Sequence, residues 1–258
     1  MPDDLLLHFE KRVLAGGYRT YFEIKRNNFF ASINHLPKIW ASFMALDEVW
    51  MREFEDLYHP RDMGVVLPVI LFMNAHAQFR IAMELGFSGA MNECWNTLRM
   101  GIESVYHACV LLADPNLTVA WAEKAQATAE AERAFAKAFE EGKTKSFEKL
   151  GLSKLHEFWT NFSEWSHTSV ESLSRRIKLK EGEGGLDYLE TDHQILALSL
   201  MRLLSGAHEM EKVLFTRFAD RLRLDPSLVK KRSRFESAAE AARRDTIVRF
   251  KIPRPGLL

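Results

Sequence analysis

The amino-acid sequence predicts an all-α protein, a helical bundle of seven to nine helices. Three observations support this fold class. Apolar residues recur at three- and four-residue steps through most of the chain, no segment has the pattern of a strand, and glycine or proline stands between the periodic segments. No long linker or fixed-period repeat interrupts the 258 residues, so we expect a single helical domain over residues 1–258.

The stretch Phe87–Ala113 predicts one helix at the centre of this bundle. It is apolar or small on almost every side, which is typical of a helix inside its domain. One narrow stripe is polar and recurs at three- and four-residue steps, so its members share one face: Asn92, Asn96, Arg99, Glu103, Tyr106 and His107. A charged stripe on a buried helix needs water, a pocket or partners on other helices.

Four helices are expected before this stretch, over residues 3–15, 19–34, 37–58 and 68–85. The third opens at Pro37, where the missing N–H group costs nothing, and His59-Pro60 ends it. Gly86 separates the fourth helix from the central one.

Four more helices are expected after it, over residues 116–141, 153–177, 191–222 and from 226 onward. The first of these has the weakest apolar face, so we expect it on the outside of the bundle. Thr191 and Gln194 form a capping box at the start of the third, and Asp225-Pro226 starts the last. Residues 178–189, with three glycines, predict a mobile loop, and the prolines near the end predict an extended tail.

The two cysteines, Cys94 and Cys109, fit a reducing compartment. Fifteen residues separate them on one expected helix, or roughly 22 Å, which is too far for a disulfide. The acidic N-terminus lacks the features of a signal peptide. The longest apolar run, Val65–Met73, is far shorter than the ~20 residues of a membrane span. We therefore expect a cytoplasmic protein with no membrane partner.

Arg99, Glu103 and His107 are spaced by four residues along the polar stripe. A carboxylate beside an arginine is held ionised and can orient an imidazole one turn further on. The row is a candidate for acid–base work, phosphate binding or half of a metal site. The alternative is a hydrogen-bond network that ties helices together. Glu103 and His107 supply only two ligands where a stable metal site needs about four, so neither a metal nor a cofactor is expected.

Two short segments carry a resemblance to a known family. Residues 98–108 are Leu-Arg-Met-Gly-Ile-Glu-Ser-Val-Tyr-His-Ala, and residues 164–169 are Glu-Trp-Ser-His-Thr-Ser. They resemble the arginine–glutamate helix and the serine–histidine segment of a bacterial all-helical family of uncharacterised proteins, related to the HEPN (higher eukaryote and prokaryote nucleotide-binding) superfamily. The resemblance covers about residues 65–215. It implies a HEPN-like helical core, frequent homodimers and, in some members, RNA cleavage in toxin or antiphage systems.

By this resemblance the matched positions are Arg99, Glu103 and His167, and His107 completes the set of candidate catalytic residues. The alternative for His167 is an ordinary surface histidine. Nuclease-competent members place an arginine and a histidine closer together than the seven residues that separate Arg99 from His107. We therefore expect a protein that binds a partner or nucleic acid. Metal-independent RNA cleavage by these four residues and a pure interaction or scaffold role are the alternatives.

The C-terminal region is the basic part of a chain whose formal net charge is zero. Residues 221–258 hold eleven basic and four acidic residues, a net charge of +7, and residues 224–258 form the expected terminal helix and tail. This segment is the candidate surface for an RNA or an acidic protein partner. The alternative is docking on the chain's own acidic body, which the apolar residues of the segment favour; these are Leu222, Leu224, Leu228, Val229 and Phe235.

Overall fold

The computed structural model describes residues 17–57, 63–166, 177–180, 183–186 and 189–252, and it confirms an all-helical bundle. The long helices are α1 (Tyr18–His35), α2 (Pro37–Leu57), α3 (Met63–Phe87), α4 (Met91–Ala113), α8 (Ser153–Ser166), α10 (His193–Arg217) and α11 (Pro226–Phe250). The short helices are α5 (Thr118–Glu123), α6 (Ala129–Phe135) and α7 (Lys143–Lys149). These described ranges hold ten α-helices, more than the seven to nine that we expected.

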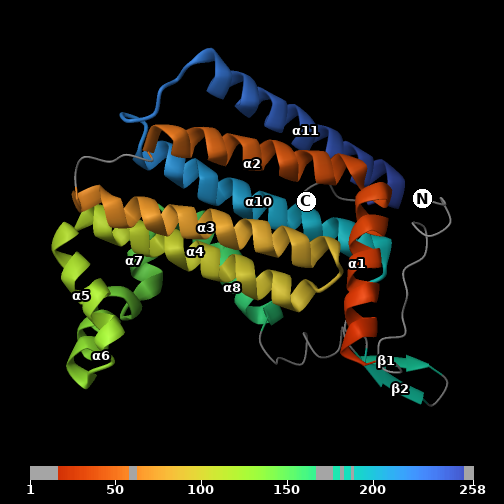
Figure 1. The fold of residues 1–258 in the computed structure, drawn as a ribbon, viewed down its shortest axis with the longest axis horizontal. Coiled ribbons are helices and arrows are strands. Elements are labelled where there is room, and N and C mark those ends of the chain that lie inside the picture. The colour runs from red at the N-terminus through yellow and green to blue at the C-terminus, as the bar shows by residue number, and fades with distance from the viewer. Residues whose placement is uncertain (1–16, 58–62, 167–176, 181–182, 187–188, 253–258) are drawn as a thin grey trace.

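Most of the long helices lie side by side, as Figure 1 shows. Helix α11 packs along α2, α3 along α4, and α10 lies in the bundle in contact with α2, α3 and α4. Helix α1 crosses one end of the bundle, while α5 and α6 project from the other end. The outside position that we expected for residues 116–141 is therefore confirmed.

The central helix begins later than the sequence predicted. Helix α3 continues to Phe87, and a turn centred on Gly89 leads into α4 at Met91. Gly89 has a φ of +84°, and a Cβ there would stand 2.6 Å from the carbonyl oxygen of Glu190, so only glycine fits. Gly86, which we expected to separate the helices, instead packs inside α3 against Leu200.

The predicted core face of α4 is confirmed over residues 91–113. Trp95, Leu98, Ile102 and Val105 are at most 1% exposed, because α3, α8 and α10 surround this helix. Cys94 and Cys109 are buried free thiols, as the sequence indicated.

Helix α3 is the one described helix that is long and apolar enough to cross a membrane, over the stretch Gly64–Phe87. About half of the most apolar part of this stretch is buried in the fold. It begins before Pro68, which lies inside the helix. Its polar side chains are tied to α2: Asp47 accepts hydrogen bonds from His76 Nε2 at 2.7 Å and from Arg80 Nε at 2.7 Å. These are the contacts of a core helix in a bundle.

The region after α4 departs from the expected helices in several places. The helix expected over residues 153–177 is described as α8 only to Ser166, and Ile177 belongs to a strand. The single helix expected over residues 116–141 is broken, because Ala127 adopts a φ of +51° and Thr128 caps a new helix. The loop expected over residues 178–189 contains a hairpin of β1 (Ile177–Lys180) and β2 (Glu183–Leu186), paired antiparallel. The first strand, Ile-Lys-Leu-Lys, alternates apolar and charged residues, but four residues are the shortest run that indicates a strand, and the two glycines of β2 favour a loop.

Helix α10 starts at His193, and its cap is Asp192, whose side chain accepts from the backbone of Gln194 and Ile195. The capping box expected at Thr191 is therefore wrong by one residue. The cap and first proline of α11, Asp225-Pro226, are confirmed. The helix expected over residues 3–15 and the prolines of the tail lie outside the described residues.

Candidate functional site

The polar stripe of α4 faces α7 and α8. Arg99 Nη1 donates to Glu103 Oε1 at 3.1 Å, as the four-residue spacing predicts. Their side chains keep 20% and 26% of their surface exposed, so the pair lies in a partly buried seam.

Two further donors converge on the same carboxylate oxygen. Trp159 Nε1 of α8 donates to Glu103 Oε1 at 3.0 Å, and Lys143 Nζ of α7 lies 3.5 Å away. Burial alone would raise the pKa of Glu103, but the indole N–H and the charges of Lys143 and Arg99 together hold that pKa below its ordinary value. A carboxylate held ionised in this way is a weak general base near neutral pH, because efficient bases have a pKa near the working pH.

His107 does not join this network. Its ring packs edge-on against Phe135 and Phe139, at centroid distances of 5.6 and 5.1 Å. Burial and the nearby Lys143 lower the pKa of His107 to about 4, so the imidazole is neutral at physiological pH. Its Nε2 atom is buried without a hydrogen-bond partner, and no hydrogen bond between described residues joins it to Glu103. The orientation of His107 by Glu103 that the spacing predicted is therefore absent.

His167, the fourth candidate, lies outside the described residues. The two segments that carry the family resemblance nevertheless come from neighbouring helices, because α8 packs along α4. Trp165, two residues before His167, stands 5.1 Å from Trp95 on α4, measured between ring centroids. Whether His167 approaches Arg99 and Glu103 remains a prediction.

Replacing Glu103 by glutamine should lower the free energy of unfolding by about 1–3 kcal/mol, because it removes charge-assisted hydrogen bonds from a partly buried seam. The pKa of Glu103 is depressed in the folded state, so this stabilisation is present above the ordinary glutamate pKa and is lost as the pH falls through the folded value. Urea unfolding measures it. Glu157→Gln, an exposed acid on α8, is the control, and equal small losses for both variants would show that the network adds no stability.

A second cluster of charges lies between α2, α10 and α11. Arg232 Nη2 donates to Glu53 Oε1 at 2.7 Å and also to Glu211 Oε1. The side chains of Glu53 and Glu211 are 0% and 1% exposed. One guanidinium cannot neutralise two buried carboxylates, and burial together with the charge of Glu53 raises the pKa of Glu211 well above its ordinary value. Burial therefore favours the protonated form of Glu211 more than water does.

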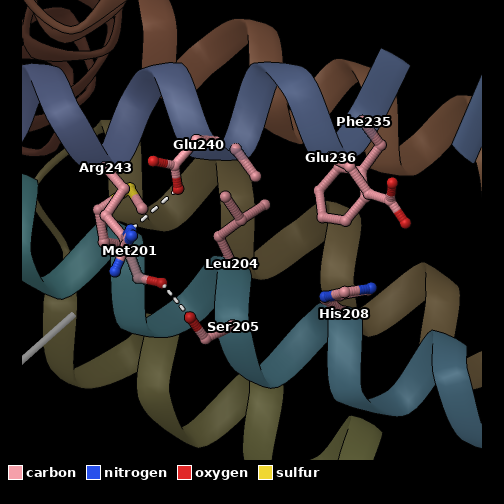
Figure 2. Close-up of a pocket in the computed structure, with 9 residues that line it drawn as sticks. Met201, Leu204, Ser205, His208, Phe235, Glu236, Glu240 and Arg243 are labelled. Atoms are coloured by element: carbon pink, nitrogen blue, oxygen red, sulfur yellow. Dashed lines mark hydrogen bonds and ion pairs between the residues drawn. The ribbon is translucent and has the colours of Figure 1, made fainter. Parts of the chain in front are cut away.

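A pocket of about 240 Å³ lies beside this cluster, between α10 and α11. It is lined by Met201, Leu204, Ser205, His208, Phe235, Glu236, Ala239, Glu240 and Arg243. Figure 2 shows Arg243 paired with Glu240 at one end and the ring of His208 beneath Phe235 at the other. Burial lowers the pKa of His208 to about 4, so it offers a neutral imidazole. The pocket is smaller than the ~300–1,000 Å³ of typical ligand sites, so it could admit only a small molecule.

Neither the cluster nor the pocket was predicted from the sequence, although a signal for the cluster existed. Glu211 falls on the apolar face of its helix, one turn from Ala207 and from Leu214, and Glu53 likewise follows Val49 on the inward face of α2. An acid inside an apolar stripe predicts a buried partner, but the sequence gives no means of finding that partner on another helix.

Within the described ranges, no group of three or more histidine, cysteine, aspartate or glutamate side chains could hold a metal ion.

The fold and these sites define an all-helical bundle protein with buried polar networks. Comparison of the chain with protein-family models, with curated proteins and with solved structures found no match. The HEPN-like core and the functions that follow from the resemblance therefore stay expectations.

Proposed function

We propose that the protein is a helical binding protein whose partner is an anionic polymer or acidic protein surface, with single-stranded RNA as the first candidate. The contact surface is the basic outer side of α11. The observation that carries this proposal is an excess of cations on that helix over the acids that approach it.

Eight cations lie between Lys230 and Lys251, against three acids of the same segment. Three further acids reach it from α2 and α10: Glu48, Glu53 and Glu211. Two acids each serve two cations, because Glu48 contacts both Lys231 and Arg234, and Glu240 contacts both Arg243 and Arg244. Arg234 and Arg244 keep 64% and 72% of their side-chain surface exposed. A net positive charge therefore remains on the outer side.

Internal docking neutralises part of the basic charge. Arg223 binds Asp56 of α2 at 2.7 Å, and Arg232 reaches the buried acids. The segment's own Asp225 binds Arg52 of α2 at 2.6 Å, which fastens the segment to α2 without neutralising any of its cations. Leu228 and Phe235 anchor the same helix in the core. The segment therefore docks on its own chain, as its apolar residues predicted. The basic surface that remains is smaller than the net charge of +7 for residues 221–258 suggested.

The RNA-cleaving alternative has no supporting observation among the described residues. Glu103 is held ionised by three donors, and His107 is enclosed by aromatic rings. A binding role is therefore the function that the geometry supports best.

Neutralising the outer face of α11 should weaken RNA binding. We expect the full chain to bind a mixed-sequence single-stranded RNA at low salt, with an affinity that falls steeply as salt rises. The triple variant Lys230→Gln, Arg234→Gln, Arg244→Gln should bind more weakly. Its slope of log affinity against log salt should be smaller by up to about 2, since each lost phosphate contact on a single strand removes ~0.7. Fluorescence anisotropy at several salt concentrations measures both quantities.

The full chain is required for this experiment, because deleting α11 would remove buried core residues. A matched control removes three exposed cations elsewhere: Arg19→Gln, Lys145→Gln and Lys149→Gln. No binding by the unmodified protein at low salt, or an equal loss in the control, would rule out α11 as the binding surface.

A further inference from the structure

The pocket between α10 and α11 combines an apolar lining with a few polar side chains. Met201, Leu204 and Phe235 are at most 4% exposed, and together with Ala239 they form the apolar part of the lining. An apolar cavity of about 150 Å³ holds a benzene ring. The volume of about 240 Å³ therefore has room for one ring, or for a short branched chain, with a polar group attached.

The polar groups of this pocket that remain free are mainly hydrogen-bond acceptors. The hydroxyl of Ser205 donates its proton to the carbonyl oxygen of Met201 at 3.0 Å (Figure 2), so only its lone pairs are left for a ligand. The carboxylate of Glu236 is exposed and has no ion pair or hydrogen bond among the described residues. The neutral ring of His208 offers one acceptor nitrogen beside one N–H group.

The cation of the pocket is already engaged. Arg243 Nε donates to Glu240 at 3.1 Å, and the same carboxylate contacts Arg244 at 3.2 Å. An anion bound to Arg243 would have to compete with Glu240 for the guanidinium and would approach that carboxylate. A cation bound to Glu236 displaces nothing, and Arg234, two residues earlier, stands on nearly the opposite face of the helix.

We propose that this pocket binds a small organic ammonium ion, a primary amine that carries one aromatic ring or a short branched chain. Its apolar part lies against Met201, Leu204 and Phe235. Its ammonium group lies at the end of the pocket where Figure 2 shows Glu236 and His208, and there it donates hydrogen bonds to the carboxylate and the imidazole. The ring of Phe235 adds an aromatic surface, which attracts a cation as well as a second ring.

Three probes with the same ring separate the charge of the ligand from its shape: benzylammonium, benzyl alcohol and benzoate. We expect benzylammonium to bind with a Kd on the order of 1 mM, because so small a molecule buries few atoms. Benzyl alcohol should bind more weakly, and benzoate most weakly of the three. The readout is the Met201 methyl signal in NMR spectra of protein labelled at its methionine methyl groups. A spectrum of Met201→Leu assigns that signal, and the other methionines report binding elsewhere.

Two substitutions place the ligand in the pocket. Glu236→Gln keeps the size of the side chain and removes its charge, so the Kd of benzylammonium should rise about two- to fivefold, as expected for an exposed ion pair, while that of benzyl alcohol stays the same. Glu130→Gln, an exposed acid on the projecting α6, is the matched control and should change neither value. Ala239→Leu fills the pocket and should weaken both probes by at least about fivefold.

Four results would overturn the proposal. They are a Met201 signal that benzylammonium does not shift, benzoate or benzyl alcohol that binds as tightly as benzylammonium, equal effects of Glu236→Gln and Glu130→Gln, and binding that a folded Ala239→Leu protein retains. Tighter binding of benzoate would place an anion on Arg243 instead. Circular dichroism checks the fold of each variant. If Ala239→Leu fails to fold, Glu236→Gln decides the question, because Glu236 is exposed and its replacement leaves the core intact.

Discussion

Replacing Arg232 by methionine should lower the free energy of unfolding by about 3–5 kcal/mol. The guanidinium is the only cation in hydrogen-bond contact with Glu53 and Glu211 among the described residues, and both acids are buried. Without it, Glu53 must either stay charged in the interior or take up a proton. Methionine keeps much of the apolar volume over the ring of Phe215, so packing loss contributes little.

The control for this prediction is Glu211→Gln. A glutamine resembles the protonated carboxyl that burial favours at this position, so the variant should lose far less stability than Arg232→Met. A further variant that replaces Arg232, Glu53 and Glu211 together by apolar residues should recover most of the loss. A loss below about 1 kcal/mol for Arg232→Met would contradict the account of this cluster.

The same cluster predicts a pH dependence. The pKa of Glu211 is raised in the folded state by burial and by the charge of Glu53, so its contribution to stability is complete below the ordinary glutamate pKa and is lost as the pH rises through the folded value. The stability of the unmodified protein minus that of Glu211→Gln should therefore decrease from acidic to neutral and alkaline pH. Urea unfolding of both proteins across this range measures the difference. An increase with pH would mean that Glu211 is ionised in the folded protein.

Replacing Leu98 by alanine should cost about 2–5 kcal/mol, because its side chain is 0% exposed and the smaller residue leaves a cavity at the centre of the bundle. Gly206 of α10 packs directly against it, with the Leu98 Cδ2 atom 3.3 Å from the position that a Cβ at Gly206 would occupy. Helix α10 cannot easily move in to fill the space, since the ring of Phe162 contacts the same position.

Met100→Ala is the matched control for Leu98→Ala. Met100 lies on the same helix, is 45% exposed and is also truncated to alanine, so its loss should be small. Equal losses for the two variants in urea unfolding would show that α4 is not the central helix of the core.

Helix α4 and the partners of Glu103 show what the sequence could and could not predict. The apolar face of α4 was predictable, because a three- and four-residue period over more than twenty residues has a single structural interpretation. The Arg99–Glu103 pair was predictable for the same reason, since both residues lie on one helix. Trp159 and Lys143 were not, because they reach Glu103 from positions 56 and 40 residues further along the chain.

The two ends of α3 were predicted at the wrong residues, and the helix propensities of the residues there do not reveal why. Gly86 and Gly89 look alike in the sequence, but only Gly89 faces a backbone carbonyl that excludes a Cβ. The interior position of Pro68 shows that α3 tolerates a proline where tertiary packing holds the helix, so the first turn of α3 could not be predicted from propensity. His107 has the right spacing for a site, yet its surroundings come from the projecting residues near α6, and nothing in its own helix indicates those aromatic rings.

We propose that the protein binds an anionic partner and does not cleave it. The most direct test is the fate of an end-labelled single-stranded RNA of mixed sequence after incubation with the protein, resolved on a denaturing gel, with Glu103→Gln run in parallel. We expect the RNA to stay intact with both proteins at concentrations where both bind it. Fragments produced by the unmodified protein and absent with Glu103→Gln would contradict it, and would make the seam of Arg99 and Glu103 an active site.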